Sequence, residues 1–334
     1  MTENKDISKK KSLGAGQALF CIMSAVALFL TVTHSDIAIS SMLKGMELCV
    51  HTLIPSLFPF MVLSDIFVTS GAAQMLSRPV GRLFSRAFGI CQEGVGALLL
   101  GVVCGFPVGT RSALSLYERG RISRGELEHL LSFCNGPSSA FLIFAVGDGL
   151  FGSRRFGILL CVAEALSALI IGIAARRYFA AKKRKCESLG WLSEEKADKK
   201  TDSGKQRGAY LIVDAVSSNA LNMLTICSFV VFFSALTGFL QAFAEYWRLG
   251  GECAAFLIGF FEMTGGVSAA AEYANPVVAP LIAAALVGWS GLSVHFQFIS
   301  LCKDYEFSKK PYFVAKIARS ALDVAIVCVG MRWV

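Results

Sequence analysis

The stretch Gly105-Phe106-Pro107-Val108-Gly109 interrupts one hydrophobic run, and Glu262-Met263-Thr264-Gly265-Gly266 interrupts another. Glycine and proline stop helices, and each interruption carries or adjoins a charge, Arg111 in the first and Glu262 in the second. A helix broken inside a bilayer leaves backbone groups unpaired, which is tolerated only where the break is buried in protein or lines a polar cavity. The pair therefore predicts a binding site for something that crosses a membrane.

The composition indicates a membrane setting. Of 334 residues, 54% are hydrophobic and 17% are charged, which is too apolar for a solvated surface. The net charge of +8 lies mainly in short segments between apolar runs, as in cytoplasmic loops, and not in a nucleic-acid-binding patch. Eleven cysteines are scattered without metal-ligand spacing. We expect an all-α polytopic membrane protein without a metal, a cofactor or a nucleic-acid partner.

The chain divides into four segments. These are an N-terminal tail with a first transmembrane helix (1–36), a first repeat (37–180), a basic cytoplasmic linker (181–208) and a second repeat (209–334). The apolar run at 17–33 is interpreted as an uncleaved span with a cytoplasmic N-terminus, because its only A-x-A motif lies inside the run. The halves resemble each other, since 93–101 is similar to 251–259 and each leads into one of the two breaks.

The first broken segment is too short to cross a membrane. Residues 95–105 would form about 17 Å of helix, against a hydrocarbon core of about 30 Å. A re-entrant hairpin fits this length, and the matching segment would enter from the opposite face. Counting crossings by the positions of lysine and arginine predicts about seven transmembrane helices and two re-entrant hairpins in inverted repeats, an arrangement found in many secondary transporters.

Arg111, with Gly109 and Thr110, is expected at the start of a short half-helix. Free backbone N–H groups and a guanidinium together suit a carboxylate or a phosphate, although an arginine near a hairpin base also snorkels to the interface. Further polar groups fall at a second interruption in each half and beside the second break. They are Asn135, Ser138 and Ser139 in the first half and Thr264, Ser290 and Ser293 in the second, all candidates for substrate contact or for inter-helix hydrogen bonds.

Glu262 is the best-placed intramembrane acid. Such a residue normally has a partner, so it would bind a coupling cation, carry a proton or pair with Arg111. His295 is a second candidate for coupling, with a hydrogen bond to a neighbouring helix as the alternative. Asp65, Glu164 and Asp323 also lie in apolar runs and are interpreted as helix-pairing groups. Pro55 and Pro59 are expected to kink their span.

Several of these pieces resemble the YlbJ (SpoVV) family of sporulation integral membrane proteins, which belongs to the nucleoside-recognition or Gate-domain proteins. The matching pieces are Pro55-Ser56-Leu57-Phe58-Pro59-Phe60, the break at 105–111, Phe133-Cys134-Asn135, the break at 261–266, and Gly288-Trp289-Ser290-Gly291-Leu292-Ser293-Val294-His295 with Gln297. The resemblance implies two Gate-like repeats and a fold akin to concentrative nucleoside transporters. For sporulation members it implies passage of dipicolinic acid across the outer forespore membrane.

The leading hypothesis is a multi-pass bacterial membrane transporter or facilitator of a small organic anion, with dipicolinic acid first. A nucleoside or nucleobase carrier and a non-transporting scaffold for spore envelope assembly are the alternatives. No nucleophile–base constellation is visible, so we do not expect an enzyme. The expected partners are an anionic small molecule and the lipid bilayer, with a coupling cation or proton and a homo-oligomer left open.

Overall fold

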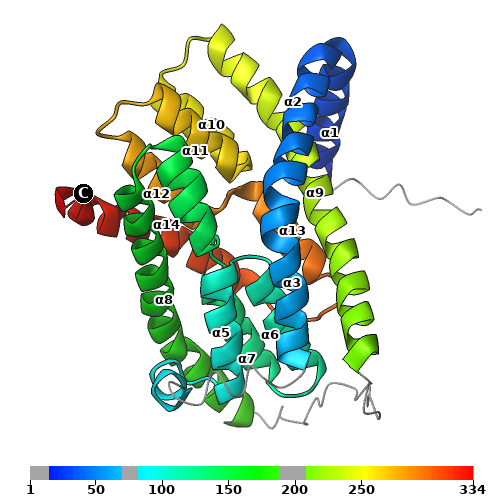
Figure 1. The fold of residues 1–334 in the computed structure, drawn as a ribbon, viewed down its shortest axis with the longest axis vertical. Coiled ribbons are helices and arrows are strands. Elements are labelled where there is room, and N and C mark those ends of the chain that lie inside the picture. Colours follow the sequence, from blue (N-terminus) through cyan, green and yellow to red (C-terminus); the bar gives the residue numbers. More distant parts are fainter. Residues whose placement is uncertain (1–14, 70–80, 189–207, 334) are drawn as a thin grey trace, which may run out of the picture.

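The computed structural model describes residues 15–69, 81–188 and 208–333, and every regular element in these ranges is helical (Figure 1). The first half contains α1 (Ala15–Thr33), α2 (Ser35–Leu48), the π-helical turn η1 (Cys49–Leu53), α3 (Ile54–Thr69), a helix at Gly81–Phe88, α5 (Gln92–Cys104), α6 (Val108–Glu118), α7 (Arg124–Phe133), the π-helical segment η2 (Phe141–Leu150) and α8 (Arg154–Ser188). The second half contains α9 (Gly208–Tyr246), α10 (Gly251–Phe261), α11 (Met263–Tyr273), α12 (Ala279–Trp289), α13 (Gly291–Leu301), α14 (Lys310–Gly330) and a 3-10 turn at Met331–Trp333.

Within the described ranges, three helical segments are long and apolar enough to cross a membrane: Arg154–Ala181, Leu211–Tyr246 and Ala279–Leu301. The number rises to five if each of two sharply bent helix pairs counts as one span. One pair joins α1 to α2 with a bend of 99°, and the other joins Gly81–Phe88 to α5 with a bend of 93°. The expected count of about seven therefore stays a prediction, because breaks and buried charges keep the remaining segments below the length and apolarity of an ordinary span.

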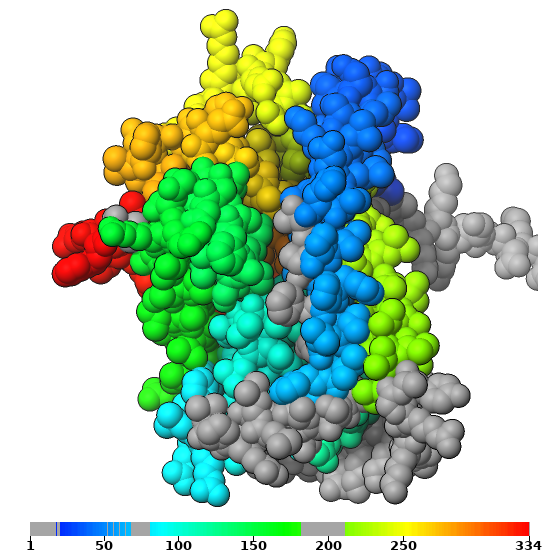
Figure 2. All heavy atoms as spheres, viewed as in Figure 1, coloured from blue at the N-terminus to red at the C-terminus, as the bar shows by residue number. Residues whose placement is uncertain are grey.

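The long helices expose apolar stripes to their surroundings. On α8, Ile158, Val162 and Ile170 are exposed, while Leu160 and Ala163 on the opposite side are buried. A stripe of this kind on a helix longer than 30 Å is expected to face lipid rather than water. Figure 2 shows α2, η1 and α3 as a separate blue ridge along one face of the molecule. These surfaces and the long apolar helices together make the chain a multi-pass membrane protein.

Both predicted breaks are helical hairpins. The first joins α5 to α6 across Gly105–Pro107, and the second joins α10 to α11 at Glu262. In each hairpin the two half-helices touch at a pair of glycines. A Cβ on Gly109 would lie 2.8 Å from the Cα of Gly101, and a Cβ on Gly266 would lie 2.1 Å from the Cα of Gly259. Only glycine permits so close a backbone approach.

The two halves contact each other in matched pairs. Helix α6 of the first hairpin touches α13, and α11 of the second hairpin touches η2. Helix α7 touches α14, and α12 touches α8. Figure 1 shows the two hairpins toward opposite ends of the molecule, with α14 crossing at a level between them. Each hairpin therefore contacts an element of the other half of the chain.

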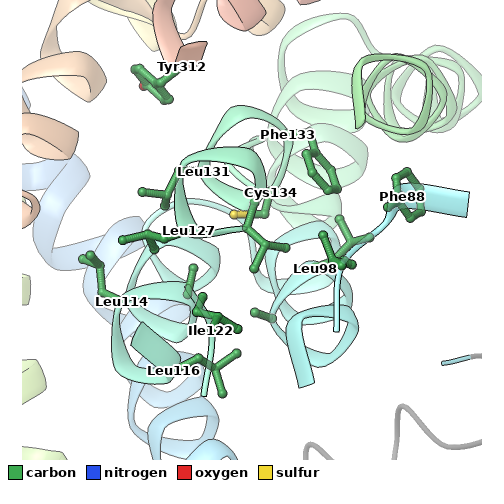
Figure 3. Packing of buried hydrophobic residues seen from close by; sticks show 14 of the residues in the cluster. Phe88, Leu98, Leu114, Leu116, Ile122, Leu127, Leu131, Phe133, Cys134 and Tyr312 are labelled. Carbon is green, nitrogen blue, oxygen red and sulfur yellow. The ribbon is translucent and has the colours of Figure 1, made fainter. Parts of the chain in front are cut away.

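Two apolar cores support this arrangement. One packs α5, α6 and α7 with α13 and the start of α14, and the other packs α10, α11 and α12 with η2 and α8. Figure 3 shows part of the first core, where Leu98, Leu114, Leu127 and Leu131 from the three short helices converge. Each core thus joins one hairpin to the interrupted helix of its own half and to an element of the other half.

The loop between α13 and α14 is fixed on the first hairpin and α7. The Ser308 amide donates to Glu128 at 3.0 Å, and the Tyr305 hydroxyl donates to Glu118. Burial, and next the hydrogen bond to Glu118, raise the pKa of the Tyr305 hydroxyl above its usual range. These contacts hold the start of α14 against the first half of the chain.

Two local expectations need correction or detail. The predicted linker at 181–208 begins inside α8, which continues to Ser188 because its alanine, lysine and arginine residues favour helix. Residues 189–207 of that linker lie outside the described residues. At the predicted kink, the π-helical turn η1 directly precedes α3, which carries Pro55 and Pro59. A proline ring and its missing N–H disturb the regular ladder, and a wider turn accommodates them.

The glycine contacts predict a clear effect of Gly109→Ala. The new Cβ would lie 2.1 Å from the Cys134 carbonyl oxygen, so the first hairpin must separate from α7. Overpacking of this kind costs about 1–3 kcal/mol, which thermal unfolding in detergent would detect as a lower midpoint. The matched control is Gly125→Ala in α7, where nothing lies within 4 Å of the new atom. Equal midpoints for both variants would contradict the tight packing of the hairpin.

Candidate functional site

The first hairpin docks on the interruption that follows α7. Gly105 adopts a left-handed φ of +76°, and a Cβ there would lie 2.4 Å from the Ser138 amide nitrogen. The Phe106 amide donates to the Gly136 carbonyl at 2.7 Å. As predicted, the chain stops being helical around Asn135 and restarts beyond Ser138, whose hydroxyl accepts from the Phe141 amide at 3.2 Å. The two irregular segments therefore satisfy some of each other's backbone hydrogen-bonding groups.

The second hairpin docks on the interruption between α12 and α13 in the same manner. Ser290 has a left-handed φ of +74°, which is uncommon for a residue with a side chain. A Cβ on Gly291 would lie 2.8 Å from the Met263 amide nitrogen. The Trp289 indole donates to the Phe260 carbonyl at 3.1 Å. Both predicted interruptions of the second half are thus observed, and they lie against each other.

Lys316 of α14 joins the two docked pairs. Its ammonium donates to the Asn135 carbonyl at 2.6 Å and to the Ser290 hydroxyl at 2.7 Å. The side chain is buried, and both acceptors are uncharged. An ammonium has three donors, so these two bonds leave one for another acceptor. Lys316 is therefore the point where the interrupted helices of the two halves meet.

Asn135 is at the centre of this polar cluster. Its side-chain oxygen accepts from the Thr110 hydroxyl at 2.5 Å, and its side-chain nitrogen donates to the Leu131 carbonyl at 2.5 Å. Thr110 and Asn135 are fully or almost fully buried. The structure thus brings together three predicted site residues, Thr110, Asn135 and Ser290, and adds Lys316.

A buried ion pair lies next to this cluster. Arg319 is one turn beyond Lys316 on α14; it donates to the Phe133 carbonyl at 2.8 Å and pairs with Glu164 of α8 at 3.4 Å. A cavity of about 20 Å³, enough for about one water molecule, touches both members of this pair together with Gly136 and Ser139. Lys316 and Arg319 thus donate hydrogen bonds to two backbone carbonyl groups where α7 ends.

Arg111 faces a different part of the molecule. It lines a cavity of about 270 Å³ between α3, α6 and α9, together with Asp65, Glu118 and Asp214. Thr110 and Arg111 are consecutive residues of α6, so their side chains point about 100° apart around the helix. The structure therefore does not bring Arg111 to the Asn135–Lys316 cluster.

Glu262 caps α11. Its two carboxylate oxygens accept from the Thr264 amide at 3.0 Å and from the Gly265 amide at 2.6 Å. Both oxygens are thus occupied by backbone groups of the second break, and not by Arg111. This geometry gives Glu262 a local structural role that is compatible with the earlier coupling hypothesis but does not require it.

The remaining predicted residues surround the cluster. Ser139 donates to the Val102 carbonyl of α5 at 3.1 Å, and Ser293 is buried in α13. His295 shares a hydrogen bond of 2.9 Å with the Tyr312 hydroxyl, as the alternative interpretation expected. Its ring also lies against Trp289.

Lys316 and Arg319 were missed by the sequence argument. The available signal was their position with Asp323 in the final apolar run, at spacings of three and four residues, which places all three charges on one helix face.

This geometry can be compared with known proteins. The chain is similar to the sporulation integral membrane protein YlbJ of Bacillus subtilis (strain 168), with 27% identity over 342 aligned positions that cover 93% of this chain and 82% of the relative. This similarity confirms the predicted resemblance to the YlbJ family. No family model and no solved structure matches this chain.

The capping geometry predicts a difference between two Glu262 variants. Glu262→Ala removes both acceptors of the α11 N-terminus and should cost about 0.5–2 kcal/mol, whereas Glu262→Gln keeps a side-chain oxygen and should cost less. Thermal unfolding in detergent measures both, with the exposed Glu272→Ala of the same helix as the control. An equal loss in the Gln and Ala variants would show that the charge, and not the cap, is what matters.

The bridging geometry predicts that Lys316→Met loosens the contact between the two halves. The change keeps most of the side-chain volume but leaves the Asn135 carbonyl without its donor, at a cost of about 1–3 kcal/mol. The readout is the thermal midpoint in detergent. Lys310→Met, at an exposed position of the same helix, should leave the midpoint unchanged. A Lys316→Met midpoint equal to that of the control would refute the bridge.

Proposed function

We propose that this chain is a membrane carrier of a small organic anion, and not an enzyme. The observation that carries the proposal is Lys316, a buried ammonium between two helix interruptions, with only uncharged acceptors at hydrogen-bonding distance. A buried cation with neutral partners favours the approach of an anion, and its remaining donor suits a carboxylate oxygen.

The helical architecture supports transport. Helices α10 and α11 have 11 residues each, or about 17 Å, and α5 has 13 residues, or about 20 Å. None of these half-helices crosses a hydrocarbon core of about 30 Å, so we infer two re-entrant hairpins. Because these hairpins lie toward opposite ends of the molecule, we infer that the two repeats are inverted. This arrangement implies about seven transmembrane helices, with the site near the middle of the membrane.

The inferred cargo and location follow from the relative and from the family resemblance. The relative's name describes a sporulation integral membrane protein, so we infer a membrane role in sporulation. The family resemblance implies a place in the outer forespore membrane. Dipicolinic acid is the first candidate because the family resemblance implies it. It also carries two carboxylates, and a carboxylate suits a site built around Lys316.

Uptake of labelled dipicolinate into proteoliposomes tests the proposal. Wild-type protein should give uptake above empty liposomes, and Lys316→Met should lower it about tenfold, equivalent to about 1.4 kcal/mol. Lys316→Arg, which keeps the charge, should retain part of the uptake. The controls are Lys310→Met, at an exposed position of α14, and Asp148→Asn, in a surface ion pair with Arg154.

Three results would contradict the proposal or redirect it. Uptake by Lys316→Met at the wild-type rate would remove this residue from the pathway. Competition by nucleosides but not by dipicolinate would favour a nucleoside or nucleobase carrier. Absence of any flux, together with full sporulation in a strain whose breaks are filled with leucine, would favour the scaffold. Arg111→Ala in the same assay tests whether the cavity of about 270 Å³ that Arg111 lines contributes to uptake.

A further inference from the structure

Asp323 of α14 is the most unusual buried group among the described residues. Its side chain is 0% exposed, and neither carboxylate oxygen has a hydrogen-bond partner. The Oε1 atom of Glu164, on the facing helix α8, also lacks a partner. An isolated buried carboxylate is costly, and native proteins rarely leave one unsatisfied. Among the described residues, these oxygens are therefore open to a bound proton or ligand.

Two hydroxyl groups near Asp323 donate to backbone carbonyl groups, although Ser167 also lies within reach of the Asp323 carboxyl group. The Ser320 hydroxyl donates to the Ala285 carbonyl at 2.8 Å, and the Ser167 hydroxyl donates to the Glu164 carbonyl at 3.1 Å. On the α12 side, a Cβ on Gly288 would lie 2.6 Å from Asp323 Oδ2, so the backbone of α12 closes the site. Residue 288 must therefore be glycine if the carboxyl group is to fit.

The charged groups around Asp323 come from two helices. Helix α8 supplies Glu164, and α14 supplies Arg319 and Lys316, while the part of α12 beside it supplies Gly288 and no charge. Arg319 is engaged with the other oxygen of Glu164, and Lys316 with Asn135 and Ser290. With every group ionised, the cluster has two positive and two negative charges, but neither cation donates a hydrogen bond to Asp323.

A single proton resolves this arrangement. The Asp323 and Glu164 carboxyl groups lie within hydrogen-bonding reach of each other. A proton on one Asp323 oxygen can therefore be donated to the unpartnered Oε1 atom of Glu164, which satisfies one atom of each carboxyl group at once. Two facing carboxylates that share one proton are a well-known physical solution to like charges in a buried site. The Oε2 atom of Glu164 keeps its ion pair with Arg319.

We propose that Asp323 and Glu164 form a proton-binding site that couples proton movement to anion binding at Lys316. With the proton bound, the four-residue cluster has a net charge of +1, and an anion beside Lys316 restores neutrality. Without the proton the cluster is neutral, and the anion would be buried with an uncompensated charge. The coupling half of this inference rests on the proposed function, whereas the proton site does not.

The proton site is tested without transport, by infrared difference spectroscopy of the purified protein in lipid. The wild-type protein should show the carbonyl stretch of a protonated carboxylic acid at neutral pH, and Asp323→Asn should remove it. Asn at this position still donates to Glu164 Oε1, so the fold should persist. Asp148→Asn is the control, because that carboxylate is paired with Arg154 at the surface at 2.6 Å. A spectrum without the band, or a band unchanged in Asp323→Asn, would overturn the site.

The coupling is tested in the proteoliposome assay. An inward proton gradient should accelerate wild-type dipicolinate uptake, and Asp323→Asn and Glu164→Gln should abolish this acceleration because they can no longer exchange the shared proton. Gradient-independent uptake in the wild type would overturn the coupling. An infrared band in a protein that moves no dipicolinate would instead refute the proposed substrate and leave the proton site standing, so the two failures are distinguishable.

Discussion

The structure depends on how the broken backbone at the end of α7 is satisfied. Phe133 and Asn135 present carbonyl oxygens that no helical turn completes, and the side chains of Arg319 and Lys316 supply the donors. Positive groups at a helix C-terminus also complement the partial negative charge of the helix dipole. Without α14, this irregular segment would be buried and unpaired, at several kcal/mol for each group.

The same constraint explains the glycines. Each hairpin must lie close to an irregular segment of its own half, and each must fold back on itself within a few residues. Gly109 and Gly266 allow the backbones to touch, and Gly105 supplies the left-handed turn that directs the first hairpin toward Ser138. Side chains at these positions would separate the segments that satisfy each other's hydrogen bonds, so the backbone pairing and the close packing are not independent.

The buried charged residues of α14 differ in the partners that they have. Arg319 has a carboxylate partner, Lys316 has neutral partners, and Asp323 has none. Groups that are fully paired stabilise a single state, whereas partly satisfied buried groups respond to an added proton or ligand. This difference is why we place the proposed chemistry at Lys316 and Asp323, and assign Arg319 to support of the broken helix.

The sequence by itself determined the membrane class, the helical content and the positions of all four interruptions, because apolar runs, glycine and proline act through local backbone physics. The long charged segment beginning at 181 illustrates the limit, since α8 extends into it on helix propensity alone. Only the tertiary structure decided which polar residues meet. Lys316 and Asn135 are 181 residues apart, and of the adjacent residues Thr110 and Arg111, the first bonds to Asn135 and the second lines a separate cavity. Such contacts depend on the rotation of each helix about its axis and on its packing partners, and neither is encoded in any local stretch of the chain.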